Sequence, residues 1–466
     1  MRSWVRGIAF AVASAASLVP AACSEDEPAP ASTFTPGAVQ RPPLAANARG
    51  LLDRRGLVHA HSVYSHDACD GAPRDESGAI DRVCLEDFRR GLCQAKHDFV
   101  MLTDDDDSLA RTDFRELTLF DPARGDELIE RDGRPVASRL ACPDGTKALV
   151  LVGVEGGTMM PVGLEEHVAA TEEERARVYR SKEAADLERL RAAGAVTLVA
   201  HTEQWTAEQL AALPLDGFEM YNLHANTIVG GGCVVQLIAK LNSEPEQLPH
   251  PDLTLLPIVN EDPKYLGTWG SVLATGARRV TTMGTDCHRN TFKSELPDGE
   301  RMDSYRRMMI WFSNHLLVRP DGAGGFDDRA LKEALRGGRL YGVFDVLGSP
   351  VGFDYRAESG AGPAEMGASV PLAPGLELVV TAATVADLGP GDDRPDLVTR
   401  LLRARPGGWD VVAEAAGDLR HAPAEPGAYR AEIRMKPRHL TRFLKGFAEY
   451  GERDYVWIYA NPIYVR

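Results

Sequence analysis

The sequence lacks a surplus of basic residues, and this excludes one broad class of partner. Lysine and arginine total 52 against 68 aspartate and glutamate residues, so the formal net charge is -16 over 466 residues. A surface of this sign repels the phosphate backbone of nucleic acids instead of releasing its counterions. We therefore expect no nucleic-acid partner.

Several common motifs are also absent. The chain has no P-loop, no nicotinamide-binding fingerprint and no serine-based catalytic triad. The consecutive glycines 230–232 lack the strand-to-helix context of a phosphate-binding loop. No Cys-x-x-Cys pair is present, so we expect no structural zinc ribbon.

The N-terminal residues are typical of an export signal. Arg2 and Arg6 flank the start of an apolar run over residues 8–19, which is too short to span a bilayer as a permanent helix. The run leads into Pro-Ala-Ala-Cys ending at Cys23, which resembles a bacterial lipoprotein signal with Cys23 as the lipidated residue. An ordinary signal peptide cleaved nearby is the alternative. We expect an exported protein of the periplasm or cell envelope that contacts the membrane only through this lipid anchor.

The remaining cysteines are few and even in number, which suits an oxidising compartment. One or two disulfides are expected, and the sequence leaves their pairing open. Four candidates lie in and around apparent insertions, Cys233 lies further on, and Cys287 lies inside a motif described below; the four are Cys69, Cys84, Cys93 and Cys142.

Composition divides the chain into four parts. Residues 1–23 form the signal, and residues 24–50, rich in Pro, Ala, Ser and Thr, are expected to be a flexible linker. Residues 51–347 alternate short apolar runs with amphipathic stretches, which predicts an α/β domain with a parallel sheet closed as a barrel. Residues 348–466 are rich in β-type runs separated by Gly, Pro and Asp, which predicts a small antiparallel sandwich.

The apolar pattern also predicts individual elements. In the larger domain, strands are expected at residues 57–61, 99–103, 149–155, 196–201, 217–221, 255–259, 279–284 and 315–318. Helices are expected around residues 85–92, over the charged run 172–190 and at residues 328–336. In the C-terminal part, strands are expected at residues 376–381, 410–413, 429–434 and 455–459.

Potential metal ligands stand at the ends of the expected strands. His59 and His61 are separated by one residue, so on a strand both side chains point to the same face and can reach one ion. Two histidines on an edge strand are the simpler explanation of this pair taken alone. Asp286 and His288 repeat the spacing after another strand, and His201 ends a third.

Carboxylates occupy equivalent positions. Four aspartates over residues 104–107 follow an apolar strand, either as an acidic loop or as oxygen ligands for a cation. Glu155 ends an otherwise apolar strand, where burial is costly unless the carboxylate is paired or metal-bound. His167 follows and is equally explained as a surface histidine. Of twelve histidines, six fall in these segments, which favours a metal site over solvated surface: His59, His61, His66, His167, His201 and His288.

These motifs, in this order, resemble those of the PHP (polymerase and histidinol phosphatase) family of metallohydrolases. The matching motifs are His59-x-His61, Leu102-Thr103-Asp104, Gly153-x-Glu155, Ala200-His201 and Gly284-x-Asp286-x-His288. The resemblance implies a distorted barrel of seven strands and seven helices with two or three divalent ions. It implies one ion held by His59, His61, Glu155 and Asp286, a second by Glu155, His167 and His201, and a third by His66 or Asp67, Asp105 and His288.

The chain departs from the family at two places. Family members usually carry His in the slot of Asp105, so we expect the third position to favour manganese or iron over zinc. In family members a Pro often follows the histidine at the His201 position. Here the residues that follow are Thr202, Glu203 and Gln204, so the shape of the pocket is left open. The C-terminal residues 457–464 resemble the β-domain ending of a secreted, carbaryl-hydrolase-like branch that acts on small molecules.

The expected activity is hydrolysis of a small-molecule phosphoester by metal-activated hydroxide. Asp104 is expected to orient a ligand or water, Glu155 to bridge ions, and Arg289 or Lys293 to pair with substrate phosphate, although a solvated loop also explains these two cations. Hydrolysis of a carbamate, ester or amide is one alternative. A non-catalytic surface lipoprotein that binds a ligand or glycan is the other. The sequence leaves the substrate, the metal and the oligomeric state open.

Overall fold

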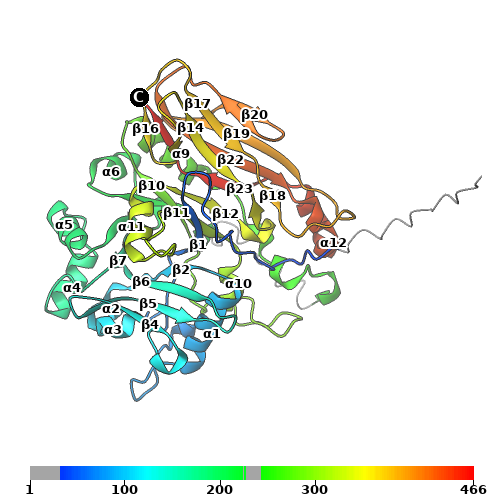
Figure 1. Cartoon of the computed structure of the whole chain (residues 1–466). Coiled ribbons are helices and arrows are strands. Elements are labelled where there is room, and N and C mark those ends of the chain that lie inside the picture. The colour runs from blue at the N-terminus through cyan, green and yellow to red at the C-terminus, as the bar shows by residue number, and fades with distance from the viewer. Residues whose placement is uncertain (1–31, 224, 227–242) are drawn as a thin grey trace, which may run out of the picture.

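The computed structural model describes residues 32–223, 225–226 and 243–466 and shows a mixed α/β fold built on a large sheet (Figure 1). Cys23 and Cys233 lie outside the described residues. Along the main path of the sheet the strands are β16 (Ser369–Val370), β24 (Ile463–Val465), β22 (Gly427–Lys436), β23 (Tyr455–Ala460), β12 (Leu340–Val343), β11 (Ser313–Val318), β1 (Leu52–Val58), β2 (Phe99–Met101), β6 (Lys147–Glu155), β5 (Arg134–Ala141) and β4 (Glu127–Arg131).

Further strands join this path from the side or form small sheets. Those that join it are β3 (Asp104–Asp105), β7 (Met159–Leu164), β8 (Val196–Val199), β19 (Asp396–Arg405) and β20 (Gly408–Ala415). Three smaller sheets pair β9 (Gly217–Asn222) with β10 (Val280–Gly284), β13 (Pro350–Val351) with β18 (Thr384–Val385), and β15 (Ala364–Glu365), β14 (Asp354–Glu358), β17 (Glu377–Thr381) and β21 (Leu419–His421) in that order.

The sheet is mixed, not uniformly parallel as the sequence suggested. Strands β1, β2 and β6 run parallel, and β9 runs parallel to β10, whereas β11 is antiparallel to β1 and β7 is antiparallel to both β6 and β8. The parallel strands β2 and β6 are almost wholly buried, which explains their continuous apolar sequences. The closed seven-stranded barrel remains a prediction.

The helices surround this sheet. Helix α1 (Arg82–Gln94) starts at Asp81, whose carboxylate accepts from two backbone N–H groups, and α11 (Asp328–Arg336) starts at Asp327, whose carboxylate accepts from the N–H of Ala330. The expected charged helix divides into α4 (Glu172–Tyr179) and α5 (Ala184–Ala192). The others are α2 (Asp106–Arg111), α3 (Phe114–Leu117), α6 (Ala207–Ala212), α9 (Pro263–Ala274), α10 (Tyr305–Met309) and α12 (Thr441–Leu444).

One expected strand is wrong. Residues 255–259 form a short 3-10 helix at Leu256–Ile258 instead. The apolar run suggested a buried strand, but Pro257 within it has no N–H group for a sheet ladder. The segment is nevertheless buried, so its apolar character reflects packing and not strand pairing.

Part of the expected linker is packed on the folded body. Phe34 and Val39 are buried, with Val39 only 2% exposed. The Arg49 guanidinium forms ion pairs with Asp354 and Glu365 on two strands of the C-terminal region. These few anchors have no regular spacing, so no periodic pattern distinguished residues 32–50 from a flexible tether.

The expected C-terminal strands are present: β20, β22 and β23 belong to the main sheet, whereas β17 belongs to the four-stranded sheet. Strand β23 pairs antiparallel with β12, placing Ala460 opposite Tyr341. Helix α9 packs against β19, β20 and β22, where the rings of Trp269 and Trp409 meet edge to face (Figure 1). The boundary at residue 348 remains a prediction. Among the described residues, no helix is long and apolar enough to cross a bilayer.

Two disulfides resolve the pairing that the sequence left open. Cys69 is bonded to Cys84 and Cys93 to Cys142, while Cys287 is a buried free thiol. Both bonds involve α1, one near its start and one near its end. The four cysteines that form these disulfides are the four in and around the apparent insertions.

Candidate metal centre

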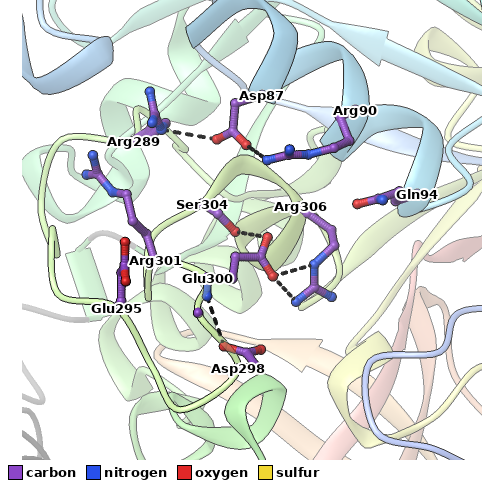
Figure 2. A pocket seen from close by; sticks show the side chains of 11 residues that line it. Asp87, Arg90, Gln94, Arg289, Glu295, Asp298, Glu300, Arg301, Ser304 and Arg306 are labelled. Carbon is purple, nitrogen blue, oxygen red and sulfur yellow. Dashed lines mark hydrogen bonds and ion pairs between the residues drawn. The ribbon is translucent and has the colours of Figure 1, made fainter. Parts of the chain in front are cut away.

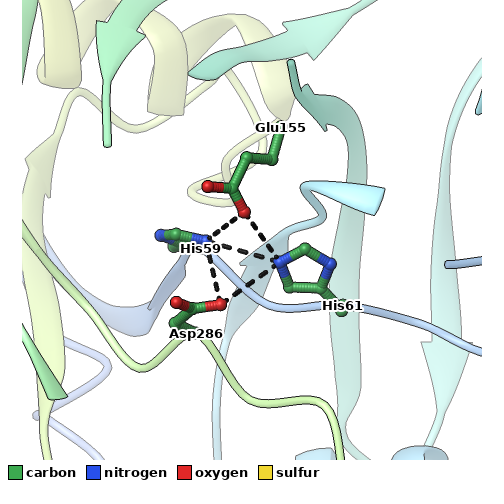
Figure 3. A group of neighbouring side chains, drawn as sticks. All are labelled: His59, His61, Glu155 and Asp286. Carbon is green, nitrogen blue, oxygen red and sulfur yellow. Dashed lines mark hydrogen bonds and ion pairs between the residues drawn. The ribbon is translucent and has the colours of Figure 1, made fainter. Parts of the chain in front are cut away.

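The predicted ligands from distant parts of the chain meet at one place. His59 and His61 follow β1, Glu155 ends β6, His201 follows β8, and Asp286 follows β10. Figure 3 shows four of these side chains converging from separate elements. His59, His61, Glu155 and Asp286 are all buried, and their ligand atoms lie within 4.8 Å of one another.

The chain turns sharply where three of these ligands stand. His59, His201 and Asp286 have φ values of 91°, 50° and 53°, in the left-handed region that non-glycine residues rarely adopt. Such conformations persist only where the surrounding structure holds them, and they gather at functional sites. Figure 3 shows the side chains of His59 and Asp286 pointing toward one another from two of these turns.

The distances between four ligand atoms fit tetrahedral coordination of a cation. Nε2 of His59 and Nε2 of His61 are 3.4 Å apart, and each lies 3.1 Å from Oε2 of Glu155. Oδ1 of Asp286 lies 3.3 Å and 3.4 Å from the same two nitrogens. Bonds of about 2.0 to 2.1 Å in a tetrahedron place the ligand atoms about 3.3 to 3.4 Å apart. The residues therefore fit a divalent ion at their centre.

The other oxygens of the two carboxylates face a second position. Oε1 of Glu155 lies 3.2 Å from Nε2 of His201, and Oδ2 of Asp286 lies 3.4 Å from the same nitrogen. Each carboxylate thus turns one oxygen to the first position and one to the second. This is the arrangement expected of carboxylates that bridge two cations.

A third group lies beside the first. His61, Asp67 and His288 offer ligand atoms within 4.8 Å of one another. Nε2 of His288 lies 3.0 Å from Oδ2 of Asp67 and 3.4 Å from Oδ1 of Asp286. Of the two alternatives for this position, the structure brings in Asp67 and not His66.

Each of the four histidines presents Nε2 to the carboxylates and ties Nδ1 to an oxygen. His59 donates to Oε1 of Glu219 at 2.6 Å, and His61 to Oγ of Ser65 at 3.0 Å. The other two contacts are from His201 to Oε1 of Glu203 at 3.2 Å and from His288 to the backbone oxygen of Asp286 at 2.7 Å. Metal-binding histidines almost always donate their second N–H in this way, because it fixes the ring and leaves the lone pair on Nε2.

Glu219 is a residue whose role sequence reasoning missed. It lies within β9 and is fully buried, with Oε2 accepting from Nδ2 of Asn222 at 3.1 Å and from the backbone N–H of His201 at 3.3 Å. It lies in the expected strand at residues 217–221, but no sequence pattern joins it to His59. Gly284 makes room for this pair: a Cβ there would lie 1.7 Å from Oε1 of Glu219.

The buried carboxylates of the cluster favour positive charge beside them, whether it is a proton on a histidine or a metal ion. Burial acts to lower the pKa of His59, but the carboxylates of Glu219, Asp286 and Glu155 outweigh it and hold the pKa well above its ordinary value. Burial acts to raise the pKa of Glu155, yet the histidines around it hold this pKa well below the usual range. Protons therefore compete with metal ions for the same imidazole nitrogens.

His167 requires a correction. It was expected to bind the second ion with Glu155 and His201, but its Nδ1 bonds to the Tyr179 hydroxyl at 3.0 Å and its Nε2 to the backbone oxygen of Thr112 at 2.9 Å. Both ring nitrogens are thus engaged in holding α4 beside α2. In the sequence, His167 has the same local setting as the other candidate ligands, and only its tertiary contacts distinguish it from them.

The aspartate run divides into different roles. Asp104 is fully buried and accepts from both the backbone N–H and the hydroxyl of Ser62, so it fixes the turn that carries His61. Asp105 accepts from Oγ of Ser65 at 2.7 Å, close to the third group. His66 is half exposed and pairs with Asp107 at 2.9 Å.

Arg289 lines a neighbouring cavity of about 630 Å³. There its Nε lies 3.1 Å from Oδ2 of Asp87, which also binds Arg90 (Figure 2). Lys293 is largely exposed and lies 3.5 Å from Asp70. Arg289 nonetheless directly follows His288 and also lines a small pocket with Asp286.

Comparison with known proteins adds little to this geometry. No protein-family model and no curated protein matches the sequence. Among solved structures, the chain is similar to a two-domain protein from Bacteroides vulgatus ATCC 8482 described as containing a predicted PHP-like metal-dependent phosphoesterase. Sequence identity is 12%, the match covers 90% of this chain and 98% of that one, and the TM-score is 0.33. The functional case therefore rests on the side chains of this chain.

Proposed function

We propose that the protein is a metal-dependent hydrolase of the PHP type that acts on a small-molecule phosphoester. The observation that carries the proposal is the near-tetrahedral set of His59, His61, Glu155 and Asp286. Divalent cations held there would lower the pKa of water from about 16 toward 7 and offset charge on a phosphoryl group. No other set of residues described above offers comparable hydrolytic chemistry.

The side chains would divide the work of holding two or three cations. Glu155 and Asp286 would each span the first and second positions, because their two oxygens face different histidines. His201 would complete the second position, and Asp67 with His288 the third. Asp105, an oxygen donor close to the third position, supports manganese or iron over zinc there.

We propose a positioning role for Asp104 and a substrate-binding role for Arg289. The Asp104 carboxylate holds Ser62, the neighbour of His61, and so acts on the site through the backbone. Arg289 would bind a phosphate oxygen at the rim of the site, with its pairing to Asp87 restraining the guanidinium beforehand.

Export and lipid anchoring through Cys23 remain part of the proposal. The two disulfides support it, because such bonds persist in oxidising compartments and are rare in the cytosol. The acidic composition supports a small-molecule substrate over nucleic acid.

Side-by-side assays test the activity. Purified protein loaded with Mn²⁺ is given an aryl phosphate monoester, an aryl phosphate diester and an aryl carbamate. We expect turnover of one of the phosphate substrates that is abolished by chelation and absent in Glu155→Gln. Turnover of the carbamate alone would refute the phosphoesterase proposal and leave metal-dependent hydrolysis standing. Equal turnover by wild type and Glu155→Gln would refute both.

A further inference from the structure

One carboxylate of the metal centre comes from a loop. His59, Glu155 and Asp286 lie at or just beyond the ends of buried strands, whereas Asp67 lies seven residues beyond the isolated bridge at Ala60 and just before a short 3-10 helix at Cys69–Gly71. Its side chain is 36% exposed. A ligand in this position depends on whatever holds the loop, because loops place side chains less precisely than strands do.

Backbone contacts hold this loop against the third ligand. The N–H of Cys69 donates to the backbone oxygen of His288 at 3.0 Å, and the N–H of Asp70 donates to that of Arg289 at 3.1 Å. Nδ2 of Asn290 donates to the backbone oxygen of Asp67 at 2.8 Å. These bonds set Asp67 directly opposite His288, where Oδ2 and Nε2 are 3.0 Å apart.

A disulfide fixes the same loop from the other side. Cys69 is bonded to Cys84, which lies near the start of α1 and is fully buried. The fifteen-residue separation between them includes residues 73–79, which are mostly exposed and contribute little packing of their own. The covalent bond thus replaces a long exposed connection with a direct link to the helix.

The helix at the other end of that link is itself joined to the site. Helix α1 packs against α10, and the ring of Phe88 meets that of Tyr305 edge to face at 5.0 Å. The Tyr305 hydroxyl lies 3.1 Å from the backbone oxygen of His61 and 3.3 Å from that of His288. The disulfide therefore connects Asp67 to the same frame that holds the backbone of His61 and His288.

We propose that the Cys69–Cys84 disulfide is a positioning element for the cation position formed by Asp67 and His288. Without it, only hydrogen bonds hold Asp67 opposite His288, so its position is less tightly fixed and that cation position alone loses affinity. The positions formed by His59, Glu155, Asp286 and His201 do not depend on the loop. The inference rests on the proposed metal-dependent function.

The second disulfide provides a matched control. Cys93 and Cys142 join the last turn of the same helix to the end of β5. Cys93 lies nine residues beyond Cys84, which is about 14 Å along the helix axis. Removing this bond also removes one disulfide from helix α1, but it leaves the loop of Asp67 unchanged.

The test compares two double variants of the full-length chain. Cys69→Ala with Cys84→Ala, and Cys93→Ala with Cys142→Ala, are each equilibrated with Mn²⁺, and bound metal per chain is measured by mass spectrometry and by titration. We expect the first variant to bind one cation fewer, or one cation about tenfold more weakly, a loss of the size seen when supports of metal ligands are removed. We expect the control to match wild type.

A ligand variant separates positioning from general loss of stability. Asp67→Asn alone should weaken the same single cation, and adding it to the Cys69 and Cys84 substitutions should cause little further loss, because both changes act on one position. If the alanine pair fails to fold, Cys69→Ala with Cys84→Val keeps more of the buried volume, places the larger side chain in helix α1 and is measured in the same way.

The outcomes distinguish the inference from the function on which it rests. Unchanged cation number and affinity in the folded Cys69 and Cys84 variant would overturn the inference alone. An equal loss in both disulfide variants would also overturn it, because the effect would then reflect stability. Wild-type protein that binds no cation would overturn the proposed function and this inference together.

Discussion

The Glu219 carboxylate accepts a hydrogen bond from Nδ1 of His59 at 2.6 Å, and both side chains are fully buried. The same carboxylate accepts from the backbone N–H of His201, where the chain turns into the left-handed region. One buried acid thus orients one proposed ligand directly and braces the backbone of another. Its position on the strand beside Gly284 makes it part of the frame of the metal centre.

Replacing Glu219 by Gln should weaken cation binding without unfolding the protein. The amide is nearly the same size, but it removes the charge that fixes His59 and supports its basicity. We expect the dissociation constant for Mn²⁺ to rise by about 10- to 100-fold, the usual cost of losing such a partner. Isothermal titration of metal-free protein measures it. Glu414→Gln, on a largely exposed strand, is the control and should bind as wild type does; equal affinities in all three proteins would contradict the role of Glu219.

Gly284→Ala should damage the same pair by collision. The added methyl group would lie 1.7 Å from Oε1 of Glu219 and 3.0 Å from Nδ1 of His59, so one of these groups has to move. We expect lower metal affinity and a lower melting temperature. Gly417→Ala, where no atom lies within 4 Å of the new Cβ, is the control. A Gly284→Ala protein with unchanged affinity would show that the contact is relaxed at no cost.

Arg289 can be tested as a substrate-binding residue against a purely structural role. Arg289→Met should raise KM for a phosphate ester by about tenfold, the effect of losing one charge-assisted hydrogen bond, while bound metal stays constant. Asp87→Asn removes the ion-pair partner but keeps the guanidinium. If the two variants change KM equally, Arg289 acts through its ion pair and not on substrate.

The sequence predicted the convergence of the candidate ligands better than it predicted the sheet. Spacing placed His59 with His61 and Asp286 with His288, and apolar runs placed Glu155 and His201 at strand ends, so convergence followed once those strands lay side by side. Strand direction is set by long-range pairing, and the antiparallel contacts of β11 and β7 leave no local signal. The α/β class of the fold was therefore predictable from the sequence, whereas the order and direction of the strands were not.

The failures share a physical cause. His167 has the residue type and strand-end setting of a ligand, yet Tyr179 and Thr112 claim both of its nitrogens through tertiary contacts. Glu219 is the reverse case: no sequence pattern marks it as part of the site, and only the fold brings its carboxylate to His59. In both cases the partner of a side chain lies on another element, which sequence spacing does not encode.

Histidine burial elsewhere should make stability depend on pH. Burial lowers the pKa of His439 to about 4, and its Nε2 donates to the backbone oxygen of Leu347 at 3.0 Å. Below the ordinary value of 6.5 the unfolded chain binds a proton that the folded chain does not, so stability falls as pH drops from 6.5 toward 4. Between about pH 7 and pH 5 this amounts to about 2 kcal/mol.

Urea unfolding at both pH values measures this contribution. His439→Gln keeps an N–H donor but does not titrate, so its unfolding free energy should fall by about 2 kcal/mol less than that of wild type over the same interval. Identical pH dependence in the two proteins would mean that the His439 ring takes up its proton equally in folded and unfolded chains.

Metal content tests the central claim most directly. Wild-type protein and Glu155→Gln are equilibrated with Mn²⁺, freed of excess metal and compared by mass spectrometry, with melting curves to show that both are folded. The geometry of Glu155, whose two oxygens face different histidines, predicts at least two cations per wild-type chain and a loss of both in the variant. A folded wild-type protein that retains no cation, or a Glu155→Gln protein that retains them all, would contradict it.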